Sequence, residues 1–140
     1  MKNLYLDTNV LVDFLLARQP FSTDAAALVQ FAADGRITLF ASTLSFATCY
    51  YLTRKKYSHE QVKEALRKLS DVVTVLDTPA AALTHALASD FKDFEDAIQY
   101  FSAQASATGL DAIITRDVAG FELSTLPVLE PAYARALLSA

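Results

Sequence analysis

The stretch that decides the fold is Leu4-Tyr5-Leu6-Asp7-Thr8-Asn9, a short apolar run that ends in an acid. Burying a carboxylate at the end of a strand costs free energy unless another group compensates its charge. A second run of this kind, Ile113-Ile114-Thr115-Arg116-Asp117, occurs near the other end of the sequence. Functional groups collect at the carboxyl ends of the strands in a parallel α/β sheet. We therefore expect Asp7 and Asp117 to lie close together, provided that their two strands are neighbours.

Between these runs, a dense group of acids opens a segment with a helical pattern: Asp90, Asp93, Glu95 and Asp96. We interpret Asp93 as the cap of this helix, and Glu95 as either a surface charge in the first turn or an accessory site residue. Asp96 can join Asp7 and Asp117 in one crevice. Several acids gathered at strand ends repel one another, and a divalent metal ion is the usual compensation. Oxygen ligands without His or Cys favour Mg²⁺ or Mn²⁺ over Zn²⁺.

The composition is that of a single globular domain, which we expect to span residues 1–140. With 53% hydrophobic and 20% charged residues, the chain can bury a core and is not disordered. The single cysteine, Cys49, excludes an internal disulfide and is typical of a reducing cytosol. No apolar stretch has the form of a signal peptide or a membrane span, so we expect a soluble, cytoplasmic protein. The net charge of −4 argues against nucleic-acid binding, unless a metal site accounts for several of the acids.

Short apolar runs alternate with longer amphipathic ones, which predicts an α/β fold with a central, mostly parallel sheet flanked by helices. Strands are expected at 4–7, 37–41, 72–76, 112–115 and 127–129. Helices are expected at about 10–17, 23–34, 43–56, 59–69, 79–89, 94–109 and 133–138. Asn9 and Thr78 are expected to cap two of these helices, and Ser58 with Gln61 has the form of a capping box.

Three motifs together resemble the PIN-domain family, and within it most closely the VapC-like toxin ribonucleases. They are Leu4-Tyr-Leu-Asp7-Thr-Asn9-Val-Leu-Val-Asp13, Asp93-Phe-Glu95-Asp96-Ala-Ile-Gln99 and Ile113-Ile-Thr115-Arg116-Asp117-Val-Ala-Gly-Phe121. The resemblance covers nearly the whole chain, and it implies a PIN-like three-layer sandwich. Neither the first motif nor the last is specific alone, but the pair is.

The resemblance also implies a metal-dependent endoribonuclease that leaves a 5′-phosphate and a 3′-hydroxyl. Asp7, Asp96 and Asp117 match the acidic positions of the family that hold Mg²⁺ or Mn²⁺. Asn9 and Thr115 match the polar positions that orient the acids and water. Many members of the family dimerise and are inhibited by a small antitoxin protein. The partners implied for this chain are therefore an RNA substrate, an antitoxin and a second copy of itself.

One departure from the family pattern concerns the helix after the second strand, which usually carries a further acid. Thr48 stands at that position, and no Asp or Glu occurs between Asp34 and Glu60. Asp93 or Glu95 could compensate from the other helix. If neither does, the chain is a degenerate PIN module that binds RNA or a protein without cleaving it. A third reading is a Mg²⁺-dependent phosphatase on a related scaffold, which the Asn at position 9 disfavours.

Several remaining residues have two readings each. Asp13 is interpreted as a residue of the polar face or rim, with a role in the site as the alternative. Arg116 either contacts a phosphate or pairs with an acid at the surface. His59 and His85 are interpreted as structural or surface residues, and Cys49 as buried and inert. The aromatic residues Phe46, Tyr50 and Tyr51 belong either to the core or to a partner-facing surface. The strongest group of cations is either a solvated face or an RNA-backbone contact: Arg54, Lys55, Lys56, Lys63, Arg67 and Lys68.

Overall fold

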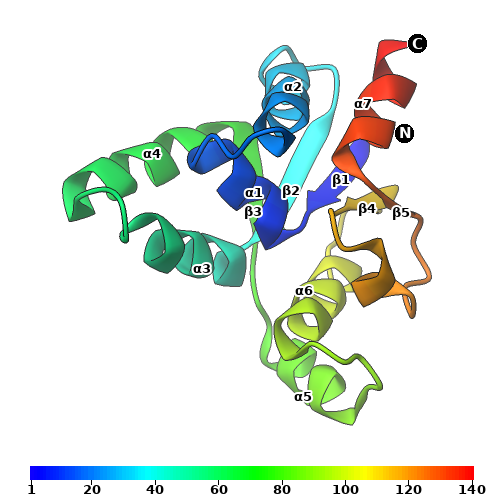
Figure 1. The fold of residues 1–140 in the computed structure, drawn as a ribbon. Helices are drawn as coiled ribbons and strands as arrows, with labels where there is room; N and C mark the ends of the chain where they lie inside the picture. Colours follow the sequence, from blue (N-terminus) through cyan, green and yellow to red (C-terminus); the bar gives the residue numbers. More distant parts are fainter.

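A five-stranded, fully parallel sheet forms the middle layer of the fold (Figure 1). The computed structural model describes residues 1–140, and none of its helices is long and apolar enough to cross a bilayer. The strands are β1 (Asn3–Leu6), β2 (Thr38–Ser42), β3 (Val73–Leu76), β4 (Ala112–Ile114) and β5 (Val128–Leu129). The helices are α1 (Thr8–Leu15), α2 (Phe21–Ala33), α3 (Thr43–Thr53), α4 (His59–Val72), α5 (Ala80–Ala88), α6 (Phe94–Gln104) and α7 (Pro131–Ser139), with a 3₁₀ helix η1 (Val118–Phe121).

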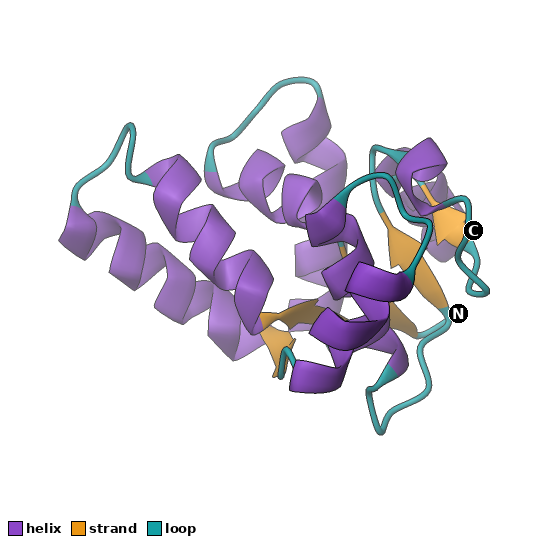
Figure 2. Cartoon of the chain, turned by 90° about the horizontal axis from the view of Figure 1, so that it is seen from below, coloured by secondary structure: helices purple, strands orange, loops and turns teal.

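The strand β1 separates two apolar layers, because successive side chains of a strand point to opposite faces. Leu4 and Leu6 pack in the larger core with residues of α1, α2, α3, α4 and α7. Tyr5, between them, packs in the smaller core with residues of α6 and η1. Helices therefore cover both faces of the sheet, as the view from below also shows (Figure 2). This is the three-layer arrangement that the sequence predicts.

The strand order β3-β2-β1-β4-β5 fixes where a site can form. From β1 the chain builds outward through β2 and β3, and it then returns to the other side of β1 to form β4 and β5. The order therefore reverses between β1 and β4, whose register pairs Leu6 with Ile114. Such a switch point is where ligands bind in open α/β sheets, outside the carboxyl ends of the strands. Asp7 and Thr115 directly follow these two strand ends.

Most predicted elements are present with boundaries shifted by a few residues. The capping box of Ser58 and Gln61 starts α4, Asp93 caps α6, and Gly35 takes a positive φ of 76° after α2. The helix expected to reach Gly109 ends at Gln104, and η1 was not predicted. Two predicted caps are wrong. Asn9 lies within α1, and Thr78 exchanges a hydrogen bond with the Thr43 hydroxyl while Pro79 occupies the cap position of α5.

Candidate metal-binding site

Asp7 occupies the N-cap position of α1, yet its side chain makes no cap hydrogen bond. Its two oxygens accept instead from distant residues: Oδ2 from Thr115 Oγ1 at 2.7 Å and Oδ1 from Gln99 Nε2 at 2.7 Å. The carboxyl group is buried, and burial raises its pKa while these two hydrogen bonds lower it. The Asp7 carboxylate is therefore held by residues far away in the sequence and does not cap α1.

Thr115 connects the carboxyl end of β4 to the start of α1. Its hydroxyl donates to Asp7, and it accepts from the Asp117 amide at 2.9 Å and from Asn9 Nδ2 at 3.4 Å. The Asn9 Oδ1 in turn accepts from the Arg116 amide at 3.4 Å. Thr115 and Asn9 thus hold the Asp7 carboxylate and the backbone that carries Asp117.

Two further acids project from the first turn of α6. Asp93 caps this helix by accepting from the Asp96 amide at 2.9 Å, which explains its place in the sequence without a ligand role. Glu95 and Asp96 each offer a carboxylate oxygen that lies, together with one from Asp7, in a group whose members are within 4.8 Å of one another. Three oxygen donors at such spacing fit a hard divalent cation.

Glu95 also reaches Thr48, the position of α3 at which an acid was expected. Thr48 Oγ1 on α3 donates to Glu95 Oε2 at 2.8 Å, so the glutamate spans the space between α6 and α3. A hydrogen bond from a hydroxyl to a carboxylate is stronger than one between neutral groups, and it holds the acid in one orientation. Of the two acids that could compensate for Thr48, Glu95 lies against it, whereas Asp93 is engaged at the helix cap.

The electrostatics of this cluster are unfavourable in the absence of a counter-ion. Burial, followed by the charge of Asp7, raises the pKa of Asp96 to about 7. The pKa of Glu95 is raised as well, first by burial and then by Asp7 and Asp93, against the hydrogen bond from Thr48. Upward shifts of several neighbouring pKa values indicate that the acids are poorly solvated and repel one another. A divalent cation removes that repulsion, which is the physical reason to consider one here.

Asp117 stands at the edge of the cluster. It is exposed, and its Oδ1 accepts from the Gly120 amide at 3.2 Å, which caps η1. A Cβ placed on Gly120 would lie 2.5 Å from Asp117 Oδ2 and 3.0 Å from Asp96 Oδ2. The two carboxylates therefore face the same small space, which stays open only because residue 120 has no side chain. Asp117 joins the group through Asp96, and it is not one of the three acids that lie closest together.

Gln99, one turn beyond Glu95 on α6, is a site residue that the sequence analysis missed. It has no exposed surface, and its amide oxygen accepts from the hydroxyls of Tyr5 at 3.1 Å and Ser45 at 3.0 Å. Those two donors fix the amide so that its nitrogen faces Asp7 and, at 3.5 Å, Glu95. The available signal was its spacing, because residues three and four apart share a helix face with Asp96 and Glu95.

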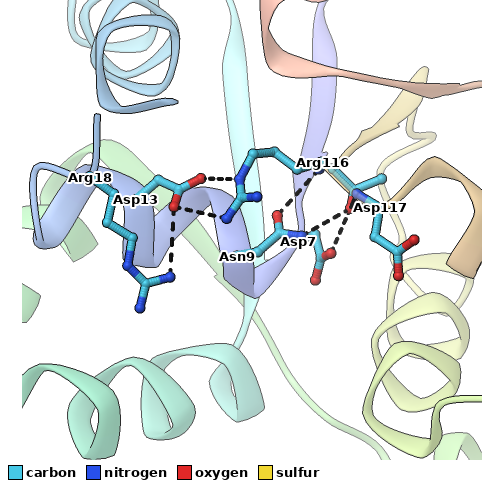
Figure 3. A network of polar contacts seen from close by, with 7 residues as sticks. Asp7, Asn9, Asp13, Arg18, Arg116 and Asp117 are labelled. Carbon is cyan, nitrogen blue, oxygen red and sulfur yellow. Dashed lines mark hydrogen bonds and ion pairs between the residues drawn. The ribbon is translucent and has the colours of Figure 1, made fainter. Parts of the chain in front are cut away.

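A second charged group lies behind the site and fixes the segment that carries Asp117 (Figure 3). Asp13 is buried and forms a two-point ion pair with Arg116 through Nε and Nη2, the latter at 3.1 Å from Asp13 Oδ1, and Arg18 adds a longer pair at 3.8 Å. The Arg116 guanidinium also lies 3.9 Å from the centre of the Phe21 ring. The expectation that Asp13 is a polar rim residue is wrong. Arg116 pairs with an acid, as one of its two readings has it, but that acid is buried and not at the surface.

The comparisons with known proteins agree with this fold. A family model described as PIN domain matches residues 3–119. The chain therefore belongs to the PIN-domain family. No curated protein matches the sequence significantly.

Two solved structures are similar to the chain in fold. One is VapBC2 from Rickettsia felis bound to a DNA fragment from its promoter, with a TM-score of 0.61 and 16% identity over 91% of this chain and 97% of the other. The second is FitAB bound to an IR36 DNA fragment, with a TM-score of 0.62 and 19% identity over 91% of this chain and 94% of the other. Each relative chain is covered almost completely, so the likeness extends over the whole fold.

Proposed function

We propose that this protein is a Mg²⁺- or Mn²⁺-dependent endoribonuclease of the VapC-like type and the toxin of a toxin–antitoxin pair. The observation that carries the proposal is the meeting of Asp7, Glu95 and Asp96 at the switch point of a PIN-domain sheet. All candidate ligands are hard oxygen donors, with no His or Cys among them, which suits these two ions. Domains of this family are generally nucleases, and three acids of this chain lie close together at the site.

The residues of the site have two roles: some would bind the cation, and others orient those ligands through hydrogen bonds. Asp7, Glu95 and Asp96 would bind the ion, with Asp117 beside Asp96 as a further acid. When bound, a divalent cation stabilises negative charge on phosphoryl oxygens and makes water a better nucleophile. Thr115 and Gln99 donate to the two oxygens of Asp7 and keep that carboxylate in one orientation.

The antitoxin partner is inferred from the similar structures, both of which are named as complexes, VapBC2 and FitAB. An antitoxin would bind this chain and suppress cleavage until it is removed. A homodimer and a cytoplasmic location belong to the same proposal.

The main alternative is a PIN module that binds RNA or a protein without cleaving it. The reason to consider this alternative is that residue 48 is a threonine and not an acid. The hydrogen bond between Thr48 and Glu95 weakens that reason, because a carboxylate from α6 occupies the neighbourhood that the usual acid would fill.

A cleavage assay separates the two functions. Purified protein is incubated with a mixed RNA pool in Mg²⁺, in Mn²⁺ and in EDTA, alongside Asp7→Asn. The matched control is Asp71→Asn, which makes the same chemical change at an exposed residue of α4. We expect metal-dependent cleavage that is lost in Asp7→Asn and kept in Asp71→Asn. If no ion supports cleavage of any RNA, the nuclease proposal fails and the non-cleaving module takes its place.

A further inference from the structure

The cations of the chain are distributed unevenly along it. Residues 54–63 contain Arg54, Lys55, Lys56 and Lys63 against the single acid Glu60, a formal charge of +3. The whole chain carries −4, which leaves −7 for the remaining residues. These four cations, which we call the basic tip, are therefore a concentrated positive feature of an otherwise acidic molecule.

Three cations of the basic tip lie in the turn that joins α3 and α4, and the fourth, Lys63, lies in the second turn of α4. The two helices pack side by side as a hairpin that projects away from the sheet in both views (Figures 1 and 2). All four cations are exposed, and none forms an ion pair; Arg54 donates only to the backbone oxygen of Tyr57 at 3.0 Å. Their charges are thus available to an outside partner.

The structure separates the basic tip from the other two cations of the sequence cluster. Arg67 is neutralised by Glu64 on the same helix. Lys68 lines a groove with Phe14 and Leu15 of α1, on the side of α4 that faces the first two helices. The six cations therefore do not form one face, and the unpaired charge is concentrated toward the end of the hairpin.

The helix α3 leads from the acidic cluster to the basic tip. Thr48 contacts Glu95 directly, and Tyr51 follows one turn later. With a rise of about 1.5 Å per residue, Thr53 at the end of α3 lies roughly 7.5 Å beyond Thr48 along the helix, a length of about two stacked nucleotides, and Arg54 and Lys55 follow directly in the turn. A strand whose scissile phosphate lies at the cluster can therefore reach the basic tip with its next few phosphates.

Tyr51 indicates which polyanion this path fits. The residue is 70% exposed, and its ring forms an edge-on pair with that of Tyr50, at 5.2 Å between centroids and 86° between planes. An exposed aromatic ring close to cations is the combination by which proteins hold single-stranded nucleic acid, through stacking and phosphate contacts together. An acidic peptide would use the cations but has no base to place on the ring.

We propose that the basic tip and Tyr51 form an arm that binds single-stranded RNA on one side of the scissile phosphate. Lys55 and Lys56 contact phosphates, and Tyr51 stacks on a base between them and the acidic cluster. The inference rests on the proposed ribonuclease function, since it takes the position of the scissile phosphate from that function.

The test measures binding and not cleavage, so that it gives an answer even if the nuclease proposal fails. A fluorescein-labelled single-stranded RNA of mixed sequence is titrated in EDTA at several salt concentrations. Lys55→Gln/Lys56→Gln is compared with Lys2→Gln/Lys68→Gln, which removes the same charge elsewhere. Each phosphate contact contributes about 0.7 to the slope of log K against log salt for a single strand, so we expect the slope to fall by about 1.4 in the first variant only.

Two further measurements make the test specific. Tyr51→Leu is expected to weaken RNA binding by about fivefold or more, whereas Tyr51→Phe keeps the ring and the affinity. Poly-glutamate is titrated in place of RNA to represent an acidic protein partner. An equal fall in slope in both lysine variants overturns the proposal, and so does tighter binding of poly-glutamate than of RNA. Metal-dependent cleavage plays no part in these readouts.

Discussion

Thr48 on α3 donates a 2.8 Å hydrogen bond to Glu95 on α6, and this contact joins the two helices that flank the acidic cluster. The resemblance to the PIN-domain family predicts an acid at position 48, and the glutamate approaches that place from α6. Glu95 thus brings a carboxylate to the part of α3 that has none of its own. Four predictions follow from this relationship and from its surroundings.

The first prediction is that an acid at position 48 can replace Glu95. Glu95→Gln removes a candidate ligand and should lower metal-dependent cleavage by tenfold or more, as about 1.4 kcal/mol of lost stabilisation does. Thr48→Glu in the Glu95→Gln background restores a carboxylate from α3 and should recover part of the lost activity. The measurement is initial cleavage rate against Mn²⁺ concentration. Thr108→Val serves as the control for loss of a hydroxyl. A double variant that is no more active than Glu95→Gln would contradict the prediction that an acid at position 48 can replace Glu95.

The second prediction concerns Gly120, which leaves room for two carboxylates. Gly120→Ala places a methyl group 2.5 Å from Asp117 Oδ2, so Asp117 must shift away from Asp96. We expect cleavage to fall at least about tenfold while the thermal midpoint changes little, because exposed groups can move at small cost. Gly109→Ala is the matched control, since a Cβ there meets nothing within 4 Å. Equal activity of the two alanine variants would refute this account of residue 120.

The third prediction is a pH dependence of the metal-free protein. The pKa of Asp96 is raised from 3.8 to about 7, with burial as the main cause, and those of Glu95 and Asp7 shift in the same direction. Between about pH 4 and pH 7 the folded state therefore binds more protons than the unfolded state. These acids make the free energy of unfolding fall as the pH rises through that range.

The corresponding measurement is the thermal midpoint in EDTA between about pH 4 and pH 8. Asp96→Asn should flatten the fall, whereas Asp71→Asn should follow the unchanged protein. Mn²⁺ should raise the midpoint more at the upper end of the range, because cation binding needs ionised carboxylates. A midpoint of the metal-free protein that rises steadily with pH would contradict the unfavourable electrostatics of the cluster.

The fourth prediction concerns the buried ion pair behind the site. Asp13→Asn leaves the Arg116 guanidinium without its carboxylate, and breaking a buried pair from one side costs about 3 kcal/mol or more in the free energy of unfolding. Arg135→Gln breaks the more exposed pair with Asp24 and should cost about 1 kcal/mol or less. Urea unfolding of both variants provides the comparison. Similar losses in both would show that Asp13 contributes no more than a surface acid.

Sequence patterns predicted the parts of the fold that depend on local signals. Asp7 and Asp117 are visible because each follows an apolar run, and Asp93 because a capping acid precedes a helical pattern. Asp13 was misplaced, because four residues beyond Asn9 it has the spacing of a polar helix face, and its burial depends on Arg116, 103 residues away.

Gln99 and Gly120 escaped prediction for a related reason. Gln99 is buried only because Tyr5 and Ser45 arrive from β1 and α3, 94 and 54 residues away, to satisfy its oxygen. Gly120 has no unusual φ to mark it, and its importance lies in the two carboxylates that happen to face it. Contacts of this kind exist only in the assembled tertiary structure. The contact between Thr48 and Glu95 belongs to the same class, because the sequence shows that position 48 has no acid and only the tertiary structure brings Glu95 to it.

The pairing of β1 with β4 also has a consequence for the order in which the protein is made. Asp7 is translated before Glu95, Asp96 and Thr115, which follow it by 88 to 108 residues. A nascent chain that stops before them lacks the hydrogen-bond partners of Asp7 and the strand β4 that pairs with β1. The acidic cluster and the strand pair that positions it therefore cannot form until α6 and β4 have followed Asp7 out of the ribosome.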